Sequence, residues 1–169
     1  REGLRAIMGV PLMDVGIPVV SKEEARGVKL IADQGLKATI IAAARAVRRD
    51  VEAAIDCGVD EVSIFIACSD LHLKYKLNMT REQVREAAVR EVEYAKAHGL
   101  MVSFVTEDTF RADRDYVVEL HNACVDAGAT REGAVGRVDH RRQNHPPKGS
   151  RVLAASDGVE CEQRDADFL

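Results

Sequence analysis

The chain has 169 residues, of which 46% are hydrophobic, 31% are charged and 4% are aromatic, and its net charge is −4. These values indicate a globular domain with its own core and exclude a wholly disordered chain. They argue against a nucleic-acid partner, because basic residues are scattered and aromatic rings are few, and no apolar run is long enough to cross a membrane. Four cysteines without a CxxC pair indicate reduced thiols in a cytoplasmic protein.

Five short apolar segments recur along the chain, and a glycine introduces each of them. A glycine readily adopts the left-handed conformation that ends a helix, and a continuous apolar run suits a strand that is buried on both faces. The pattern therefore predicts five parallel strands, which follow Gly9, Gly35, Gly58, Gly99 and Gly128.

Helical patterns lie between these segments. Ser21 and Glu24 form a predicted capping box that opens a helix running to about Gln34, and Thr80 forms a second box with Gln83. After the second box, apolar residues recur at helical spacing and predict one buried stripe, which consists of Val84, Ala88, Val92 and Ala95.

Three further segments complete the predicted helices. A shorter helix is predicted for residues 50–57, and residues 71–77 are expected to form a helical or irregular insertion. Asp113 is expected to cap the last helix. The residues of that helix that are predicted to face inward are Val117, Leu120, Cys124 and Ala127, and His121 is expected to be half exposed.

Strands that alternate with helices of this length indicate βα units around a parallel sheet. Residues 1–131 hold four to five such units, whereas a complete eight-fold barrel takes about 250 residues. The pattern leaves two possibilities open, a smaller open α/β domain or part of a barrel. Residues 132–169 break the pattern and are rich in Arg, His and Pro, so they are predicted to form a divergent, poorly ordered tail.

Several motifs occur together in the order seen in one enzyme family. Two of them are long, Ser69-x-x-His-Leu-Lys-Tyr-Lys-Leu77 and Glu107-Asp-x-x-Arg111, and two shorter ones, Asp14-Val-Gly-Ile-Pro18 and Ala43-Ala-Arg45, lie upstream. Together they resemble the homocitrate synthase and 2-isopropylmalate synthase family, and the likeness extends over residues 4–131. The resemblance implies a partial (β/α)8 barrel, truncated at both ends.

The resemblance also implies a condensation of two small molecules. Enzymes of this family join the methyl carbon of acetyl-CoA to the keto carbon of a 2-oxo acid, and the thioester is then hydrolysed. In the full enzyme a divalent metal ion, Mg²⁺, Mn²⁺ or Zn²⁺, would polarise the keto group. The expected partners are therefore a 2-oxo acid and acetyl-CoA as co-substrate, in the biosynthesis of an amino acid such as lysine or of a cofactor.

Five residues match substrate-site positions of the family, and each has an ordinary structural role as its alternative. Arg111 would hold a substrate carboxylate, or it would pair with Asp108 or Asp113 at a helix entry. Glu107 would border the substrate, or its charge would favour a helix N-terminus. The remaining three are Arg45, Asp14 and Ser69.

Arg45 would lie at the mouth of the barrel, as a substrate ligand or as an ordinary loop cation. Asp14 stands where the family has a glutamate near the substrate, and a carboxylate in an apolar strand would need a partner. Ser69, at a strand end, would contact the substrate or cap a helix. Three basic residues, His72, Lys74 and Lys76, would meet the phosphates of coenzyme A or form a solvated charged surface.

The metal ligands of the family have no secure match. They are an acidic residue on the first strand and two histidines of a His-x-His motif on a late strand, and His-x-His does not occur in this sequence. Arg1-Glu2-Gly3 mimics the first-strand signature without an apolar strand before it, so we interpret it as the end of a helix. No catalytic residue or metal ligand is therefore assigned, and this chain alone is expected to be inactive.

Substrate specificity is open at this stage. Ser63 and Ala43 stand where isopropylmalate and homocitrate synthases, respectively, often carry histidine. Homocitrate synthase, with 2-oxoglutarate as substrate, is favoured by Asp14-Val-Gly-Ile-Pro18 and by Phe110-Arg-Ala-Asp113. The alternatives are a 2-isopropylmalate or citramalate synthase, a lyase or carboxyltransferase of the same superfamily, and a non-catalytic half-barrel. Such a half-barrel would use its unpaired edge strands to form a homo-oligomer or to pair with an intact paralogue.

The abrupt change of composition at Glu132 suggests the hypothesis that the tail is read out of frame or comes from a disrupted coding sequence. The family continues after Ala129-Thr-Arg131 with an Asp-Thr-Val-Gly strand, and Glu132-Gly-Ala-Val-Gly136 stands there instead. We expect another frame of the encoding DNA to restore Asp-Thr-Val-Gly directly after Arg131. Resequencing of the gene tests this prediction, and absence of the motif from all frames would refute it.

Overall fold

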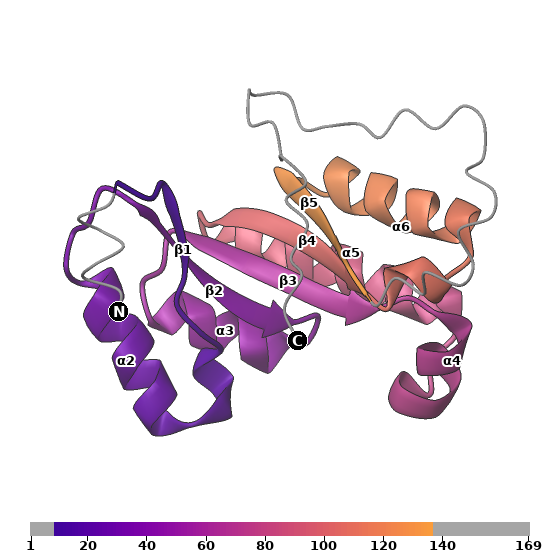
Figure 1. Ribbon diagram of the computed structural model, residues 1–169, viewed down its shortest axis with the longest axis horizontal. Coiled ribbons are helices and arrows are strands. Elements are labelled where there is room, and N and C mark those ends of the chain that lie inside the picture. Colours follow the sequence, from indigo (N-terminus) through magenta and orange to yellow (C-terminus); the bar gives the residue numbers. More distant parts are fainter. Residues whose placement is uncertain (1–8, 137–169) are drawn as a thin grey trace, which may run out of the picture. The chain divides into compact units, whose positions relative to one another are not determined.

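The sheet consists of five parallel strands whose order in space equals their order in the chain (Figure 1). A doubly wound sheet would reverse its strand order at a switch point, whereas consecutive parallel strands are the pattern of a (β/α)8 barrel. The prediction of a partial barrel with four to five βα units is therefore confirmed. In the computed structural model, which describes residues 9–136, the strands are β1 (Leu12–Asp14), β2 (Thr39–Arg45), β3 (Glu61–Ala67), β4 (Met101–Glu107) and β5 (Arg131–Val135).

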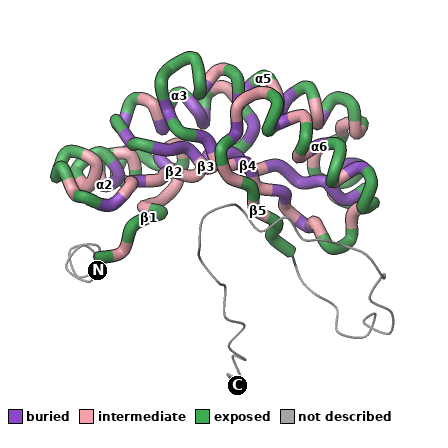
Figure 2. Tube along the Cα trace, turned by 90° about the horizontal axis from the view of Figure 1, so that it is seen from above, coloured by how far each residue is buried: buried purple, intermediate pink, exposed green. Residues whose placement is uncertain are grey.

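Helices cover one face of this sheet, the convex face in Figure 2. The four longer ones are α2 (Lys22–Ala32), α3 (Arg48–Asp56), α5 (Arg81–Ala97) and α6 (Arg114–Asp126). Within residues 9–136, none of the helices is both long and apolar enough to cross a membrane. Four short elements lie in the connections, namely η1 (Pro18–Val20), α4 (Asp70–His72), the π-helical turn η2 (Leu73–Leu77) and η3 (Thr109–Arg111).

The predicted glycine pattern corresponds to real helix and turn ends. All five glycines have positive φ angles, between 60° and 110°, and a strand begins two to four residues after each. A side chain would strain the backbone in this region, so these positions favour glycine. The five predicted strands are therefore present, although β1 is only three residues long.

The helix starts follow the predicted caps with one difference. Thr80 and Gln83 form a complete capping box, and Asp113 caps α6 by accepting a hydrogen bond from the Tyr116 amide at 2.9 Å. Ser21 accepts from the Glu24 amide at 3.0 Å, but the Glu24 carboxylate accepts from the Ile17 amide. The first box is therefore only half formed, because Glu24 fastens the preceding turn instead.

The apolar core lies between the sheet and the helices. The predicted stripe of α5 is buried in full, as are Val62 and Phe104 of the central strands. In α6 the phase differs from the prediction, since Val117 and Ala127 are only partly buried and Tyr116 is buried. The reason is a hydrogen bond from the Tyr116 hydroxyl to the Arg81 carbonyl oxygen of α5, at 3.1 Å, which turns the tyrosine inward.

The concave face of the sheet carries a buried ion pair. Glu61 of β3 is fully buried, accepts a hydrogen bond from the Ser103 hydroxyl of β4 and pairs with Arg131 of β5. A buried carboxylate without a partner is costly, so this contact holds three neighbouring strands together.

The predicted boundary at residue 131 falls inside strand β5. Glu132, on the helix side of β5, accepts a hydrogen bond from His121 Nδ1 at 2.9 Å. His121 was expected to be half exposed, but its side chain is only 13% exposed because its other ring nitrogen lies 3.1 Å from Thr106. The rest of the predicted tail, residues 137–169, lies outside the described residues.

Replacing Arg131 with leucine leaves the Glu61 carboxylate buried without its cation. We expect Arg131→Leu to lower the free energy of unfolding by about 3 kcal/mol, and Glu61→Leu/Arg131→Leu to restore much of the loss, because the double variant buries no charge. Urea unfolding followed by circular dichroism measures both.

Arg90→Leu is the matched control for this experiment. Arg90 also pairs with a buried carboxylate, that of Glu91, but Glu91 keeps its second partner Arg48 at 2.8 Å. The expected loss is below about 1 kcal/mol. Equal losses in the two arginine variants would contradict the role of the Glu61–Arg131 pair.

Candidate functional site

The carboxyl ends of β3 and β4 carry a cluster of polar side chains. Parallel barrels place their chemistry at this end of the strands, because the loops that follow neighbouring strands meet there. We call this group the mouth cluster, and it consists of Ser69, His72, Lys76, Glu107, Asp108 and Arg111.

Asp108 is the centre of the mouth cluster. Its backbone is left-handed, with φ 60°, and its side chain is only 8% exposed. The carboxylate accepts a hydrogen bond from the Ser69 hydroxyl at 2.5 Å and another from Arg111 Nε at 2.7 Å, and His72 Nε2 lies 3.7 Å away. These contacts fix the loop after β3 against the loop after β4.

The charge state of Asp108 follows from these contacts. The Arg111 guanidinium beside it holds the pKa of the Asp108 carboxyl below its ordinary value, and the Ser69 hydroxyl and the nearby His72 act in the same direction, whereas burial opposes them. The carboxylate is therefore ionised at neutral pH, and it neutralises part of the Arg111 charge.

Glu107 is the second carboxylate of the cluster. It ends β4 in register with Ala67 and Val135 of the neighbouring strands. Both of its oxygens accept from Lys76 Nζ, at 2.6 and 2.7 Å, and His72 Nδ1 lies 3.7 Å from Oε1. Glu107 therefore lies between two basic side chains of the preceding loop.

The structure brings three of the five predicted site residues into the mouth cluster, Ser69, Glu107 and Arg111. Of the two roles considered for Ser69, the structure shows the helix cap, because the hydroxyl accepts from the His72 amide at 3.3 Å at the start of α4. Arg111 makes the predicted Asp108 pair, yet its side chain remains 56% exposed. Their roles in substrate binding stay predictions.

Arg45 and Asp14 lie at the carboxyl ends of β2 and β1, outside the mouth cluster. Arg45 donates through Nε and Nη2 to the buried Asp50, at 2.6 and 3.0 Å, and thereby anchors the start of α3. Asp14 is exposed rather than buried, and it accepts from the Gly16 amide at 3.3 Å. Both therefore have structural partners at the rim, and their substrate contacts stay predictions.

Sequence reasoning gave too little weight to His72, Lys76 and Asp108. The spacing Ser69-x-x-His72-x-x-x-Lys76 is the available signal, because it places the two basic residues one helical turn apart after a capping serine. The left-handed backbone of Asp108 has no such signal, since the residue is not a glycine.

The buried thiols of Cys68, beside the mouth cluster, and of Cys124, near the end of α6, are poor nucleophiles. Cys68 follows β3 and is fully buried, and burial raises its pKa to about 11. Burial likewise raises the pKa of Cys124 to about 12. Both remain protonated near neutral pH, so the reactive groups of this region are its carboxylates and cations.

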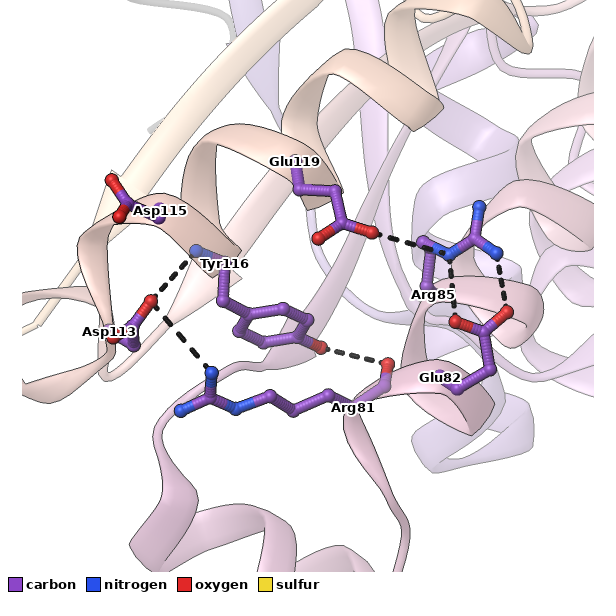
Figure 3. A pocket seen from close by; sticks show the side chains of 7 residues that line it. All are labelled: Arg81, Glu82, Arg85, Asp113, Asp115, Tyr116 and Glu119. Atoms are coloured by element: carbon purple, nitrogen blue, oxygen red, sulfur yellow. Dashed lines mark hydrogen bonds and ion pairs between the residues drawn. The ribbon is translucent and has the colours of Figure 1, made fainter.

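Away from the mouth cluster, a hollow lies between the first turns of α5 and α6 (Figure 3). It encloses about 390 Å³, and its charged groups neutralise one another, with Arg81 3.8 Å from Asp113 and Arg85 3.9 Å from Glu119. The Tyr116 ring lies between these pairs. These ion pairs therefore connect α5 to α6, and we assign the hollow a structural role.

The expected divalent metal does not fit the described residues. Between residues 9 and 136, no three His, Cys, Asp or Glu side chains converge into a set that could hold a metal ion. Glu2, the acidic residue of the signature-like start, lies outside that range. We therefore assign no step of the chemistry to a metal in this chain.

The comparisons with known proteins agree with this architecture. The family model that matches is described as HMGL-like, and it matches residues 4–134. The chain belongs to the HMGL-like family. A probable 2-isopropylmalate synthase of Ignicoccus hospitalis is 51% identical over 126 residues, which are 75% of this chain and 32% of that protein.

A second relative carries a different name. Homocitrate synthase AksA of Methanopyrus kandleri is 46% identical over 131 residues, which are 78% of this chain and 33% of that protein. The chain therefore spans about a third of the length of these two relatives. The HMG-CoA lyase of Bacillus subtilis, a solved structure with a TM-score of 0.62 and 16% identity over 78% of this chain and 48% of its own, supports the fold alone.

The lowered pKa of Asp108 predicts a pH-dependent stability. Ionised Asp108 stabilises the fold above its ordinary pKa of about 3.9, and this contribution is lost as the pH falls through the lower folded-state pKa. We expect Asp108→Asn to lower the free energy of unfolding by about 2 kcal/mol at pH 7, and the difference from the parent to shrink as the pH approaches about 3.

Urea unfolding at several pH values measures this difference. Asp126→Asn, a change of an exposed carboxylate at the end of α6, is the control and should leave stability within about 0.5 kcal/mol. A deficit in Asp108→Asn that stays constant down to pH 3 would show that the charge of Asp108 does not stabilise the fold.

Proposed function

We propose that this chain forms the first part of the substrate mouth in an enzyme that condenses acetyl-CoA with a 2-oxo acid. In this reaction a carbon–carbon bond forms between the methyl carbon of acetyl-CoA and the keto carbon. The methyl proton leaves to a base, the keto oxygen becomes a hydroxyl group, and water cleaves the thioester and releases the coenzyme A thiol. The kinship with 2-isopropylmalate and homocitrate synthases supports this reaction type.

The observation that carries the proposal is the position of Arg111. Asp108 holds the Nε side of the guanidinium at 2.7 Å, while 56% of the side chain stays exposed at the mouth. A cation that is fixed on one side and accessible on another suits a carboxylate ligand, because little side-chain entropy remains to be lost on binding. Arg111 would therefore hold the carboxylate of the 2-oxo acid.

The other predicted residues have supporting roles in this proposal. Glu107, at the end of β4, would border the bound acid on the side of β3 and β5. Ser69 would position Asp108, and through it Arg111. Asp14 and Arg45, on the first two strand ends, would face the far side of the same acid.

Two candidates remain for the 2-oxo acid that this enzyme would use. The motifs around Asp14 and Arg111 favour 2-oxoglutarate and thus a homocitrate synthase of lysine or cofactor biosynthesis. The 51% identity to a protein named 2-isopropylmalate synthase supports a branched monocarboxylic acid as the second candidate. A substrate panel decides between them.

A chimera tests the proposed reaction, because a related protein can supply the remaining βα units of the barrel. We expect a chimera, in which residues 4–134 replace the matching part of the Ignicoccus hospitalis protein, to release the coenzyme A thiol from acetyl-CoA only when a 2-oxo acid is present. The panel contains 2-oxoglutarate, 2-oxoisovalerate and pyruvate, and a thiol reagent measures the release. A folded chimera that releases no thiol with any of the three would refute the proposal.

Arg111→Ala in this chimera tests whether Arg111 binds the carboxylate of the 2-oxo acid. Loss of a charged hydrogen bond to the substrate should raise KM for the 2-oxo acid by about tenfold or more. Arg114→Ala, a change of an exposed arginine three residues further along, is the matched control and should leave KM unchanged. Equal KM values in the two variants would remove Arg111 from the site.

A further inference from the structure

Lys76 and His72 surround a carboxylate that belongs to the protein itself. Lys76 Nζ contacts both oxygens of Glu107, at 2.6 and 2.7 Å, and His72 Nδ1 lies 3.7 Å from Oε1. The lysine and the glutamate are 31 residues apart in the chain, so the loop after β3 and the end of β4 create the contact jointly. Two basic groups therefore converge on one oxyanion at the mouth.

His72 Nδ1 makes no hydrogen bond with Glu107. His72 Nδ1 is buried and has no hydrogen-bond partner among residues 9–136, since the 3.7 Å to Glu107 exceeds the length of a hydrogen bond. A buried polar atom without a partner is uncommon in folded proteins, and a water molecule or a ligand normally satisfies such an atom. A ligand oxygen placed between His72 and Lys76 would satisfy it.

The segment that carries both basic groups is held by few apolar contacts. Leu73 is the only buried residue of α4 and η2, and Tyr75 is 73% exposed. Asn78 ends the π-helical turn with a left-handed backbone, and Arg81 ties Asp70 through two hydrogen bonds of 3.0 and 2.9 Å. The segment is thus fixed at its ends, and π-helical turns of this kind often occur at functional sites.

We propose that Lys76 and His72 form an oxyanion subsite, which the Glu107 carboxylate occupies in the ligand-free protein and which a carboxylate or phosphate group of a ligand takes over. The exchange is feasible because the Lys76–Glu107 pair is partly exposed, at 49% and 32%, and such pairs contribute little net free energy. Glu107 therefore competes with such a ligand for Lys76 and His72. The subsite shares Glu107 with the proposed condensation site, but it needs Lys76 and not Arg111, so the two can be tested separately.

The whole chain, isotopically labelled and free of phosphate buffer, tests this proposal by NMR titration with inorganic phosphate in one arm and acetate in the other. We expect the amides of His72 and Lys76 to shift with at least one of the two anions. Response to phosphate alone would identify a phosphorylated ligand, response to acetate alone would identify an organic acid, and response to both supports a general oxyanion subsite. No shift with either anion in the parent chain and in Glu107→Gln would overturn the proposal.

Three variants make the test specific. Glu107→Gln removes the competing charge and should tighten anion binding by about tenfold, whereas Lys76→Met should weaken it by about tenfold. Lys37→Met, a change of an exposed lysine in the turn before β2, is the matched control and should bind as the parent does. Amide spectra show that each variant is folded, and unchanged affinity in either Glu107→Gln or Lys76→Met would overturn the subsite.

Arg111→Ala separates the subsite from the proposed reaction. This variant should keep its affinity for phosphate and acetate within about twofold. If Arg111→Ala lost anion binding while Lys76→Met kept it, the subsite would be wrong and the proposed role of Arg111 would stand. If the chimera were inactive but Lys76→Met weakened anion binding, the reaction would be wrong and the subsite would stand.

Discussion

The carboxylate of Asp108 is the group on which the mouth of this half-barrel depends. It joins the Ser69 hydroxyl after β3 to the Arg111 guanidinium after β4, and it lies near the His72 ring. A left-handed backbone at a residue other than glycine costs free energy, and the charged hydrogen bonds of Asp108 offset that cost. The strain and the contacts together hold Arg111 in one orientation before any ligand arrives.

The fold was largely predictable from the sequence because its signals are local. Glycine ends, capping residues and the α5 stripe each involve residues within a few positions of one another, and all of them reappear in the structure. The errors concern long-range contacts. The hydrogen bond of Tyr116 to α5 shifts the phase of α6, and the contacts of His121 with Thr106 and Glu132 bury a ring expected to be half exposed.

The candidate site was predictable only in part, for the same physical reason. The motif spacing brought Ser69, Glu107 and Arg111 to attention, but the partner of Glu107 is Lys76, which lies 31 residues away. The central role of Asp108 depends on its left-handed backbone, which the residue pattern does not predict. The buried thiol of Cys68 completes this picture, because its raised pKa leaves carboxylates and cations as the reactive groups near the mouth.

The strand order has a consequence for how this segment acquires its structure. Each strand pairs with the one that precedes it in the chain, and the crossover between them is a single βα connection. No strand of β1 to β5 has to wait for a distant partner, so loop-closure entropy is spent in small steps. Synthesis from the N-terminus would therefore let the sheet grow one strand at a time on the ribosome. Each new helix would then pack on the two strands that it connects.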